Sequence, residues 1–255
     1  MNTSPSIIEN KNLSETWTSA LRKICDNAGN EITPLAITLT EFSETPYIRK
    51  ALDESMAAHQ LPTIETVSET IFPQSLYAYT GYNREELYRK YKKNLPRIKS
   101  IDPSNGNGTY FERMIAFEDV EPVNQLEIII TSLTDGSIKR RSKLQASIFD
   151  PRKDHTNKPF QGFPCLQHVA FSKCEDGGLV FTSFYAIQYL YRRAYGNWLG
   201  LINLGKFVAR ETGLELKRLN CFIGVEHLDN ENITKREAKQ LLAEIDETSA
   251  VGIKI

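Results

Sequence analysis

The sequence lacks several features that would assign its class at once. Its four cysteines (Cys25, Cys165, Cys174 and Cys221) lie far apart, with no Cys-x-x-Cys pair, so we expect no zinc ribbon and no metal. Scattered single thiols are typical of a reducing compartment, which predicts a cytoplasmic protein. The 31 Lys and Arg against 32 Asp and Glu leave no excess positive charge, which weakens a nucleic-acid-binding role.

Long apolar runs are also absent. The longest apolar stretches fall far short of the ~20 residues needed to span a bilayer. Residues 1–10 have neither the basic nor the apolar segment of a signal peptide. We therefore expect no membrane span and no secretory signal. Walker, Rossmann and His-Glu-x-x-His motifs are absent as well.

The chain organisation is simple. The 255 residues show no linker-like shift in composition and no internal repeat. We expect residues 1–12 to be frayed because they are polar, and residues 13–255 to form a single α+β domain.

Local patterns predict the main elements. Trp17, Leu21, Ile24 and Cys25 recur with helical spacing. Residues 122–134 favour a helix, with a strand at 128–130 as the alternative. Alternation of apolar and polar residues over 144–148 predicts a half-buried strand. Further helices are expected at 46–58, 84–93, 201–212 and from a capping box at Thr234 and Glu237 to about 246, strands at 37–39 and 219–226, and a loop at 101–108.

The clearest local signal is a hairpin over residues 165–187. Two strand-like runs flank Asp176-Gly177, a pair that tolerates the positive φ of a tight turn. If the turn centres there, Cys165 lies opposite about Gln188 and close to residues 185–189.

Candidate chemical residues each have a structural alternative. Cys165 is either a buried core cysteine or a nucleophile that needs a thiolate-favouring site. His227 ends an apolar strand and is either a structural histidine or, with Cys165, part of a cysteine hydrolase. The pair Arg140-Arg141 is either a solvated charge pair or a phosphate ligand.

Taken together, these pieces resemble the thymidylate synthase and deoxycytidylate hydroxymethylase family. The resemblance rests on elements in a fixed order: Tyr110-Phe-Glu-Arg113, a helix, Arg140-Arg141, Pro164-Cys165, the Asp-Gly hairpin, Asn197 and a strand ending at His227. The segment Pro164-Cys165-Leu166-Gln167 resembles the archaeal-type branch of the family more than the common bacterial enzyme. The similarity covers about residues 105 to 229.

The resemblance implies a mixed or antiparallel sheet flanked by helices, and a transferase that adds a one-carbon unit from 5,10-methylenetetrahydrofolate to C5 of a pyrimidine nucleotide. Cys165 matches the nucleophile that attacks C6. Glu69 matches the catalytic glutamate, and Asn197 the reader of the base, where Asn suggests uracil. His227 matches the ligand of a sugar hydroxyl, and Arg140 and Arg141 the phosphate ligands from the partner subunit of a homodimer.

Two positions depart from the family pattern. Ala186 stands where the family has its main phosphate arginine, within an Arg-Ser-x-Asp segment, and Asp229 stands where the family has Tyr. Arg193, or its neighbour Arg192, would have to supply the missing charge. Two interpretations therefore remain beside the hydrolase: an active transferase with altered phosphate recognition, and a catalytically reduced homologue that binds a nucleotide or a protein.

Overall fold

The computed structural model describes residues 5–101, 103–118, 120–136, 140–158 and 161–252. They form an α+β structure in which seven strands build one open, mixed sheet. The sheet order is β1, β3, β7, β6, β5, β4, and β2 pairs with β7. Neighbours are antiparallel except the parallel pairs β1–β3 and β6–β7. The strands are β1 Ser6–Asn12, β2 Glu31–Ile32, β3 Leu35–Ser43, β4 Gln145–Ser147, β5 Leu166–Lys173, β6 Gly178–Tyr189 and β7 Glu215–His227.

Helices occupy most of the remaining chain. A 3-10 turn, Pro103–Asn107, follows α5, and another, Arg141–Lys143, precedes β4. A π-helical turn, Leu190–Ala194, joins β6 to α9. The α-helices are α1 Leu13–Asp26, α2 Pro46–Ala58, α3 Ile64–Ile71, α4 Gln74–Tyr79, α5 Arg84–Ile101, α6 Tyr110–Ile115, α7 Gln125–Thr134, α8 Pro151–Asp154, α9 Tyr195–Thr212 and α10 Lys235–Gly252.

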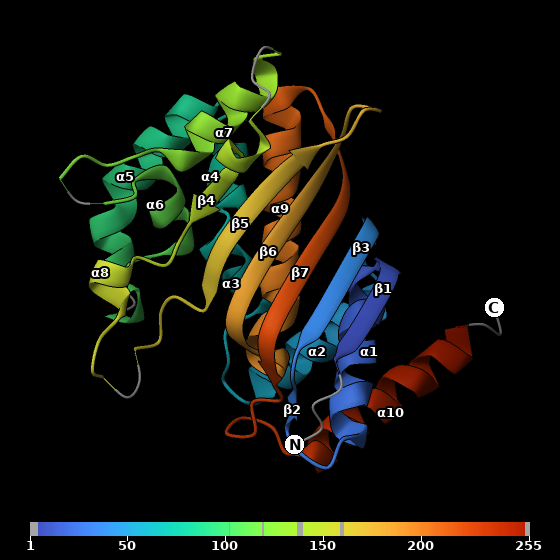
Figure 1. The fold of residues 1–255 in the computed structure, drawn as a ribbon. Helices are drawn as coiled ribbons and strands as arrows, with labels where there is room; N and C mark the ends of the chain where they lie inside the picture. The colour runs from blue at the N-terminus through green and yellow to red at the C-terminus, as the bar shows by residue number, and fades with distance from the viewer. Residues whose placement is uncertain (1–4, 102, 119, 137–139, 159–160, 253–255) are drawn as a thin grey trace.

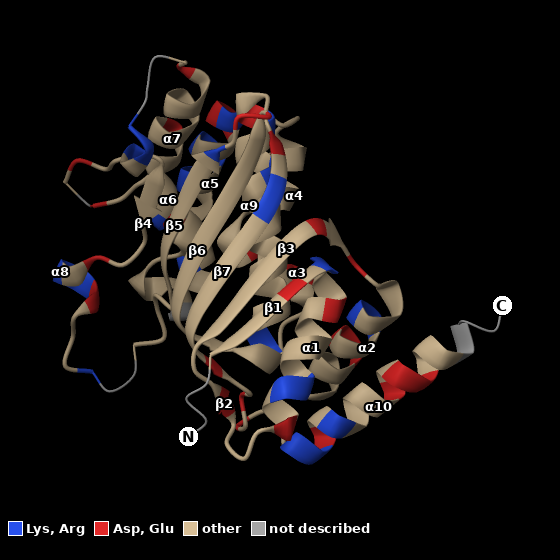
Figure 2. Ribbon diagram, turned by 45° about the vertical axis from the view of Figure 1, so that its right-hand side comes forward, with Lys and Arg blue, Asp and Glu red and all other residues tan. Residues whose placement is uncertain are grey.

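The helices flank the sheet on one face (Figure 1). The long helix α9 lies behind the sheet and contacts β6, β7 and α3, while α1 packs against β1 and β3. None of the described helices covers the opposite face. Figure 2 shows that the middle of β5, β6 and β7 is almost free of charged residues. On that face Phe184 and Phe222 are 39% and 44% exposed, and their rings stack with centroids 5.8 Å apart.

Most elements predicted from local patterns are confirmed. The helix at Trp17 is α1, whose N-cap Asn12 accepts a hydrogen bond from the Glu15 backbone N–H. The helix predicted over 122–134 is α7, which begins at Gln125, and residues 128–130 are helical and not a strand. The Asp-Gly hairpin joins β5 and β6, and Thr234 and Glu237 form the predicted capping box before α10.

Some expectations were wrong. Residues 1–4 lie outside the described part of the chain, but Ser6–Asn12 is not frayed: it forms β1, paired in parallel with β3. An edge strand tolerates polar residues because only one face needs apolar side chains, and here Ile8 is the buried one. The loop predicted at 101–108 contains a 3-10 turn, and the helix predicted at 201–212 starts earlier, at Tyr195.

The alternation of buried and exposed residues is interrupted in β5, β6 and β7 at the same level of the sheet. Buried residues alternate along β6 from Phe181 to Tyr185 and along β7 from Leu219 to Ile223. The next buried residues, Gln188 and Glu226, come three positions later. The start of β5 takes the same three-residue step and shifts its register against β6. Between β5 and β6 this step coincides with a β-bulge, an irregularity that re-aims the side chains that follow it. The strands β6 and β7 keep one register through this level, so both take the step together and both Gln188 and Glu226 are buried.

Among the described residues, every helix is too short or too polar to cross a lipid bilayer.

Candidate functional site

Cys165 lies directly before β5, next to the level at which the alternation is interrupted. Its carbonyl oxygen accepts a hydrogen bond of 3.0 Å from the backbone N–H of Ala186 on β6. The side chain is half-buried. The sequence predicts that Cys165 lies close to residues 185–189, which is confirmed. Its direct partner is Ala186 and not Gln188, and β5 shifts its register against β6 between Leu166 and His168.

Two arginines define the electrostatics around the thiol. Burial raises the pKa of the Cys165 thiol, and the positive charges of Arg193 and Arg192 oppose this rise. Both arginines come from the π-helical turn before α9. The net pKa is raised, so the thiol is protonated at neutral pH. The charge predicted to replace the missing family arginine is thus close to Cys165, but it does not outweigh desolvation.

Arg192 is held in place by its neighbours. Its Nε lies 3.3 Å from Oδ2 of the buried Asp229, and its guanidinium lies 4.4 Å from the centre of the Tyr189 ring. Arg193 is half-buried and forms no ion pair with any residue in the described ranges. Of the two, Arg193 is therefore the cation more available to an anionic ligand.

Tyr110 lies beside the backbone of Cys165 and Leu166. The N–H groups of these two residues lower the pKa of the Tyr110 hydroxyl, against the larger effect of burial. The Tyr110 ring packs against the Phe163 ring, with centroids 5.1 Å apart. Burial raises the pKa of Tyr110 further above its ordinary value, so the phenol stays neutral.

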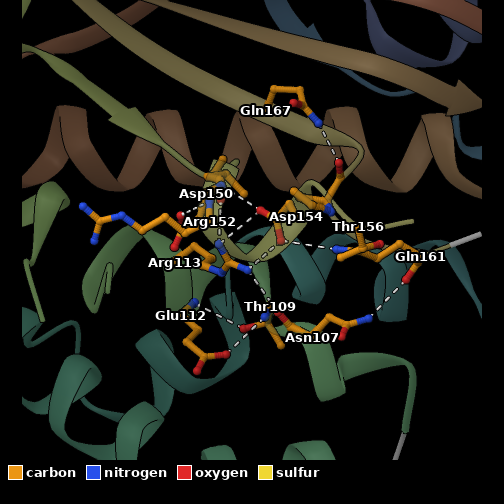
Figure 3. Close-up of polar contacts among 12 residues, drawn as sticks. Asn107, Thr109, Glu112, Arg113, Asp150, Arg152, Asp154, Thr156, Gln161 and Gln167 are labelled. Carbon is orange, nitrogen blue, oxygen red and sulfur yellow. Dashed lines mark hydrogen bonds and ion pairs between the residues drawn. The ribbon is translucent and has the colours of Figure 1, made fainter. Parts of the chain in front are cut away.

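A buried ion pair holds α6, which carries Tyr110, and the segment that leads to Cys165 (Figure 3). The Arg113 guanidinium bonds both carboxylate oxygens of Asp154, at 3.1 and 3.3 Å, and also the carbonyl oxygens of Asn107 and Ile148. Gln161 bonds Asp154 and accepts from the Asn107 side chain through its carbonyl. Arg113, which was part of the sequence motif, therefore has a structural role.

His227 lies at the end of β7, beside Tyr189, whose ring also contacts Arg192. Its ring meets the Tyr189 ring edge-on, with centroids 5.7 Å apart. The backbone N–H of Asp229 donates to His227 Nδ1 at 2.9 Å, so the neutral ring carries its proton on Nε2. His227 also lines a cavity of about 350 Å³ with Glu31 and Asn230.

Glu69 lies in a different surface cleft. The cleft lies between α3 and α5 and has a volume of about 640 Å³. Ser75 donates to the Glu69 carboxylate through its backbone N–H at 2.9 Å and its hydroxyl at 2.8 Å. Burial nevertheless raises the pKa of Glu69. None of the described contacts joins Glu69 to Cys165, but Thr109, next to Tyr110, lines the same cleft.

The remaining predicted residues are not gathered at Cys165 by any described contact. Asn197 is only 6% exposed on α9. Arg140 and Arg141 are exposed ahead of β4, and Arg140 Nε lies 3.1 Å from the Ser142 hydroxyl. The structure thus brings Cys165 close to Arg192 and Arg193, and the Tyr189 ring contacts both Arg192 and His227.

Sequence reasoning missed a group of buried polar side chains behind the sheet. No described protein atom hydrogen-bonds the Tyr185 hydroxyl, the Gln188 amide or the Glu226 carboxyl, although all three side chains are buried. The signal in the sequence was a carboxylate inside the apolar strand 221–226.

The fold and site define a class: an α+β protein with a mixed seven-stranded sheet, helices on one face and a half-buried cysteine beside two arginines. No protein-family model matches the chain, and no curated protein matches it either.

Proposed function

We propose that the protein is a thymidylate-synthase-like transferase that adds a methyl or hydroxymethyl group to C5 of a pyrimidine nucleotide. The observation that supports this most is the position of Cys165 next to Arg193, because Arg193 has no ion pair in the described chain. A nucleotide phosphate at Arg193 would bring its pyrimidine ring close to the sulfur. The thymidylate-synthase-like form of the α+β fold is part of the same proposal.

The chemistry begins at the sulfur. The Cys165 thiol loses its proton and the thiolate forms a bond to ring C6, which moves an electron pair to C5 and makes that carbon nucleophilic. C5 then attacks the methylene carbon of the donor and passes its own proton to a base. The donor, when bound, would release this carbon by cleavage of a carbon–nitrogen bond and would also supply a hydride for a methyl product, whereas water would complete a hydroxymethyl product. Breaking of the Cys165–C6 bond then restores the ring and the thiolate. Burial opposes the first step, so Arg193 is needed to stabilise the thiolate.

The donor proposed is 5,10-methylenetetrahydrofolate, which supplies a carbon at the oxidation level of formaldehyde. The cleft at Glu69 suits a flat, amphipathic ring system, because Pro73, Leu76 and Ile98 line it together with the carboxyl group. Its contact with Thr109 places one end of the cleft next to the segment that carries Tyr110. Glu69 would bind or relay a proton there.

Roles for the other residues follow the resemblance. Asn197 would read the base, with its amide favouring uracil. His227, with a proton on Nε2, would donate to a sugar hydroxyl. Arg140 and Arg141 are exposed, which suits contact with the phosphate held by a second subunit.

The homodimer is part of the proposal. The uncovered sheet face, with the stacked pair Phe184 and Phe222, offers an uncharged surface that a second copy could bury. A flat sheet face of this kind is complementary to itself across a two-fold axis.

Tritium release tests the activity. We expect [5-³H]dUMP or [5-³H]dCMP to release tritium in the presence of methylenetetrahydrofolate, and Cys165→Ala to abolish release. The matched control is Cys174→Ala, which removes a half-buried cysteine on the hairpin and should leave release unchanged. No release from any pyrimidine nucleotide with wild-type protein would contradict the transferase.

A second candidate is a catalytically reduced homologue that binds a nucleotide or a protein. The raised pKa of the Cys165 thiol favours it, since a catalytic thiol is usually stabilised as the thiolate. Tight nucleotide binding without tritium release would support this candidate.

A further inference from the structure

A row of three side chains crosses the uncovered sheet face where β6 and β7 end. Tyr189 is the ladder partner of His227, and His227 is the partner of Glu31 on β2. Glu226 and Ile32, the next pair in the same ladder, are buried, which places them on the side of the helices. Because side chains alternate between the two faces of a sheet, Tyr189, His227 and Glu31 project from the uncovered face.

His227 and Glu31 also line one cavity of about 350 Å³. The Leu228 N–H donates to the Asn30 carbonyl oxygen at 2.8 Å. The Asn27 amide donates to the Glu31 carbonyl oxygen at 3.2 Å. These bonds join the loop before β2 to the end of β7, so the fold itself forms the cavity. Its remaining lining is polar or glycine: Asn27, Gly29, Asn30, Thr33 and Asn230.

The row presents a hydrogen-bond donor and an acceptor that the described chain does not use. Nδ1 of His227 accepts from the Asp229 backbone N–H at 2.9 Å, so Nε2 carries the proton and can donate. The Glu31 side chain is exposed and forms no hydrogen bond or ion pair with any residue in the described ranges. The Cβ atoms of antiparallel partners lie roughly 4.5–5.5 Å apart, so the imidazole and the carboxylate stand side by side.

This pair of groups is complementary to a diol. A hydroxyl group accepts from an N–H and donates to a carboxylate at the same time, and the two oxygens of one carboxylate accept from two adjacent hydroxyls. Such hydrogen bonds to a charged group are stronger than those between neutral groups. An ammonium group offers only donors and a phosphate offers mainly acceptors, so neither would engage both the imidazole N–H and the carboxylate.

The row also lies within reach of a nucleotide at Cys165. The Ala186 N–H bonds the Cys165 carbonyl oxygen, and Tyr189 follows three positions later on β6, which is about 10 Å along the strand. His227 lies one strand further across the sheet. A nucleotide whose base meets the sulfur can therefore extend its sugar along β6 to the row.

We propose that Glu31 and His227 hold the 2′,3′-diol of a ribose, so that the preferred substrate is a pyrimidine ribonucleotide. This inference rests on the proposed function and deepens it, because it names the sugar and assigns its recognition to Glu31. The Glu31 carboxylate accepts from the 2′- and 3′-hydroxyls, and Nε2–H of His227 donates to the 3′ oxygen. A 2′-deoxyribonucleotide lacks the first of these hydrogen bonds.

Equilibrium binding to the full chain tests this assignment with two matched pairs of probes, UMP with dUMP and CMP with dCMP. The members of each pair share the base and the phosphate and differ only in the 2′-hydroxyl. We expect wild-type protein to bind UMP or CMP roughly tenfold more tightly than its 2′-deoxy counterpart, because the loss of a hydrogen bond to a charged group costs about this factor.

Glu31→Ala carries the discrimination. It removes both carboxylate oxygens from an exposed position, so the affinity ratio should fall close to one. The lost negative charge affects both members of a pair alike, since they carry the same phosphate, and it leaves the ratio unchanged. Glu9→Ala, an exposed change on the strand β1, is the matched control and should keep the wild-type ratio. Circular dichroism establishes that each variant is folded.

The outcomes separate the two proposals. Wild-type protein that binds dUMP or dCMP at least as tightly as the matching ribonucleotide would overturn the role of Glu31 and leave the proposed function standing. A wild-type ratio that persists in Glu31→Ala would do the same. If wild-type protein binds none of the four nucleotides, the proposed function is wrong, and this inference falls with it.

Discussion

At the residue scale, Glu226 combines full burial with a carboxyl group that has no hydrogen-bond partner in the described chain. A buried carboxyl group of this kind makes the free energy of unfolding depend on pH. In the unfolded chain the carboxyl ionises near its ordinary pKa of 4.5, whereas burial raises that pKa in the folded state. Its stabilising contribution is therefore complete below the unfolded pKa and is lost as pH rises through the folded value.

Glu226→Gln removes this dependence. We expect the variant to gain unfolding free energy relative to wild type as pH rises from about 5 to 8, by roughly 1–3 kcal/mol at the upper end. Urea denaturation at several pH values measures the difference. Glu215→Gln, an exposed change on the same strand, should show no such trend, and a pH-independent difference for Glu226→Gln would argue against a neutral buried carboxyl.

Arg193 is the second residue with a direct test. Its positive charge lowers the pKa of the Cys165 thiol against the larger effect of burial. The experiment uses protein in which the other half-buried thiol is removed by Cys174→Ala. In this background, Arg193→Gln should shift the pH profile of Cys165 alkylation by iodoacetamide to higher pH. It should also slow the reaction at neutral pH several-fold. Arg218→Gln, an exposed position on β7, is the control. An unshifted profile for Arg193→Gln would mean that the guanidinium does not act on the sulfur.

At the scale of elements, the three-residue step in the burial pattern of β5, β6 and β7 shapes the candidate site. Gly224 lies within this step on β7, where a Cβ atom would come 2.7 Å from the Ala186 carbonyl oxygen. The Ala186 backbone in turn bonds the Cys165 carbonyl. The close approach of two strands therefore fixes the backbone at Cys165.

Gly224→Ala should disturb this contact. We expect a loss of about 1–3 kcal/mol of unfolding free energy, because the backbone oxygen cannot move aside as a flexible side chain can. Thermal or urea unfolding measures it. Gly29→Ala, where no atom lies within 4 Å of the added Cβ, should change stability little. Equal stabilities of the two variants would contradict the close approach.

This step in the burial pattern also explains which elements the sequence could predict. The Asp176-Gly177 hairpin, the capping box at Thr234 and the helix α1 depend on neighbours a few residues away, so their patterns are visible in one sequence. The inward orientation of Gln188 and Glu226 depends on a step that only appears when strands far apart in sequence are stacked. Simple alternation therefore assigns these two residues to the wrong face.

The candidate site was predictable to a similar extent. The proximity of Cys165 to residues 185–189 followed from the hairpin turn, and its closeness to Arg193 followed from the search for a replacement charge. The separate cleft at Glu69 could not be foreseen, because it depends on how α3 and α5 pack. The exposed position of Arg140 and Arg141 ahead of β4 is likewise a property of the assembled sheet.

At the scale of the whole molecule, the uncovered sheet face predicts self-association. The stacked pair Phe184 and Phe222 lies on that face, and its burial would favour a dimer through the hydrophobic effect. We expect sedimentation analysis to give a homodimer for the wild type and a monomer, or a dimer weakened at least roughly tenfold, for Phe222→Asp. The exposed Val120 lies away from the sheet strands, so Val120→Asp is the control. A wild-type monomer at micromolar concentration would contradict the shared-site dimer.

The central claim is that the sulfur of Cys165 bonds to ring C6 of a pyrimidine nucleotide. Intact-protein mass spectrometry after incubation with the 5-fluoro analogues of dUMP and dCMP, with methylenetetrahydrofolate present, tests it most directly, since fluorine cannot leave C5 as a proton does. The account predicts a covalent adduct on wild-type protein and on Cys174→Ala, and none on Cys165→Ala. Unmodified wild-type protein with both analogues, or an adduct that survives in Cys165→Ala, would contradict it.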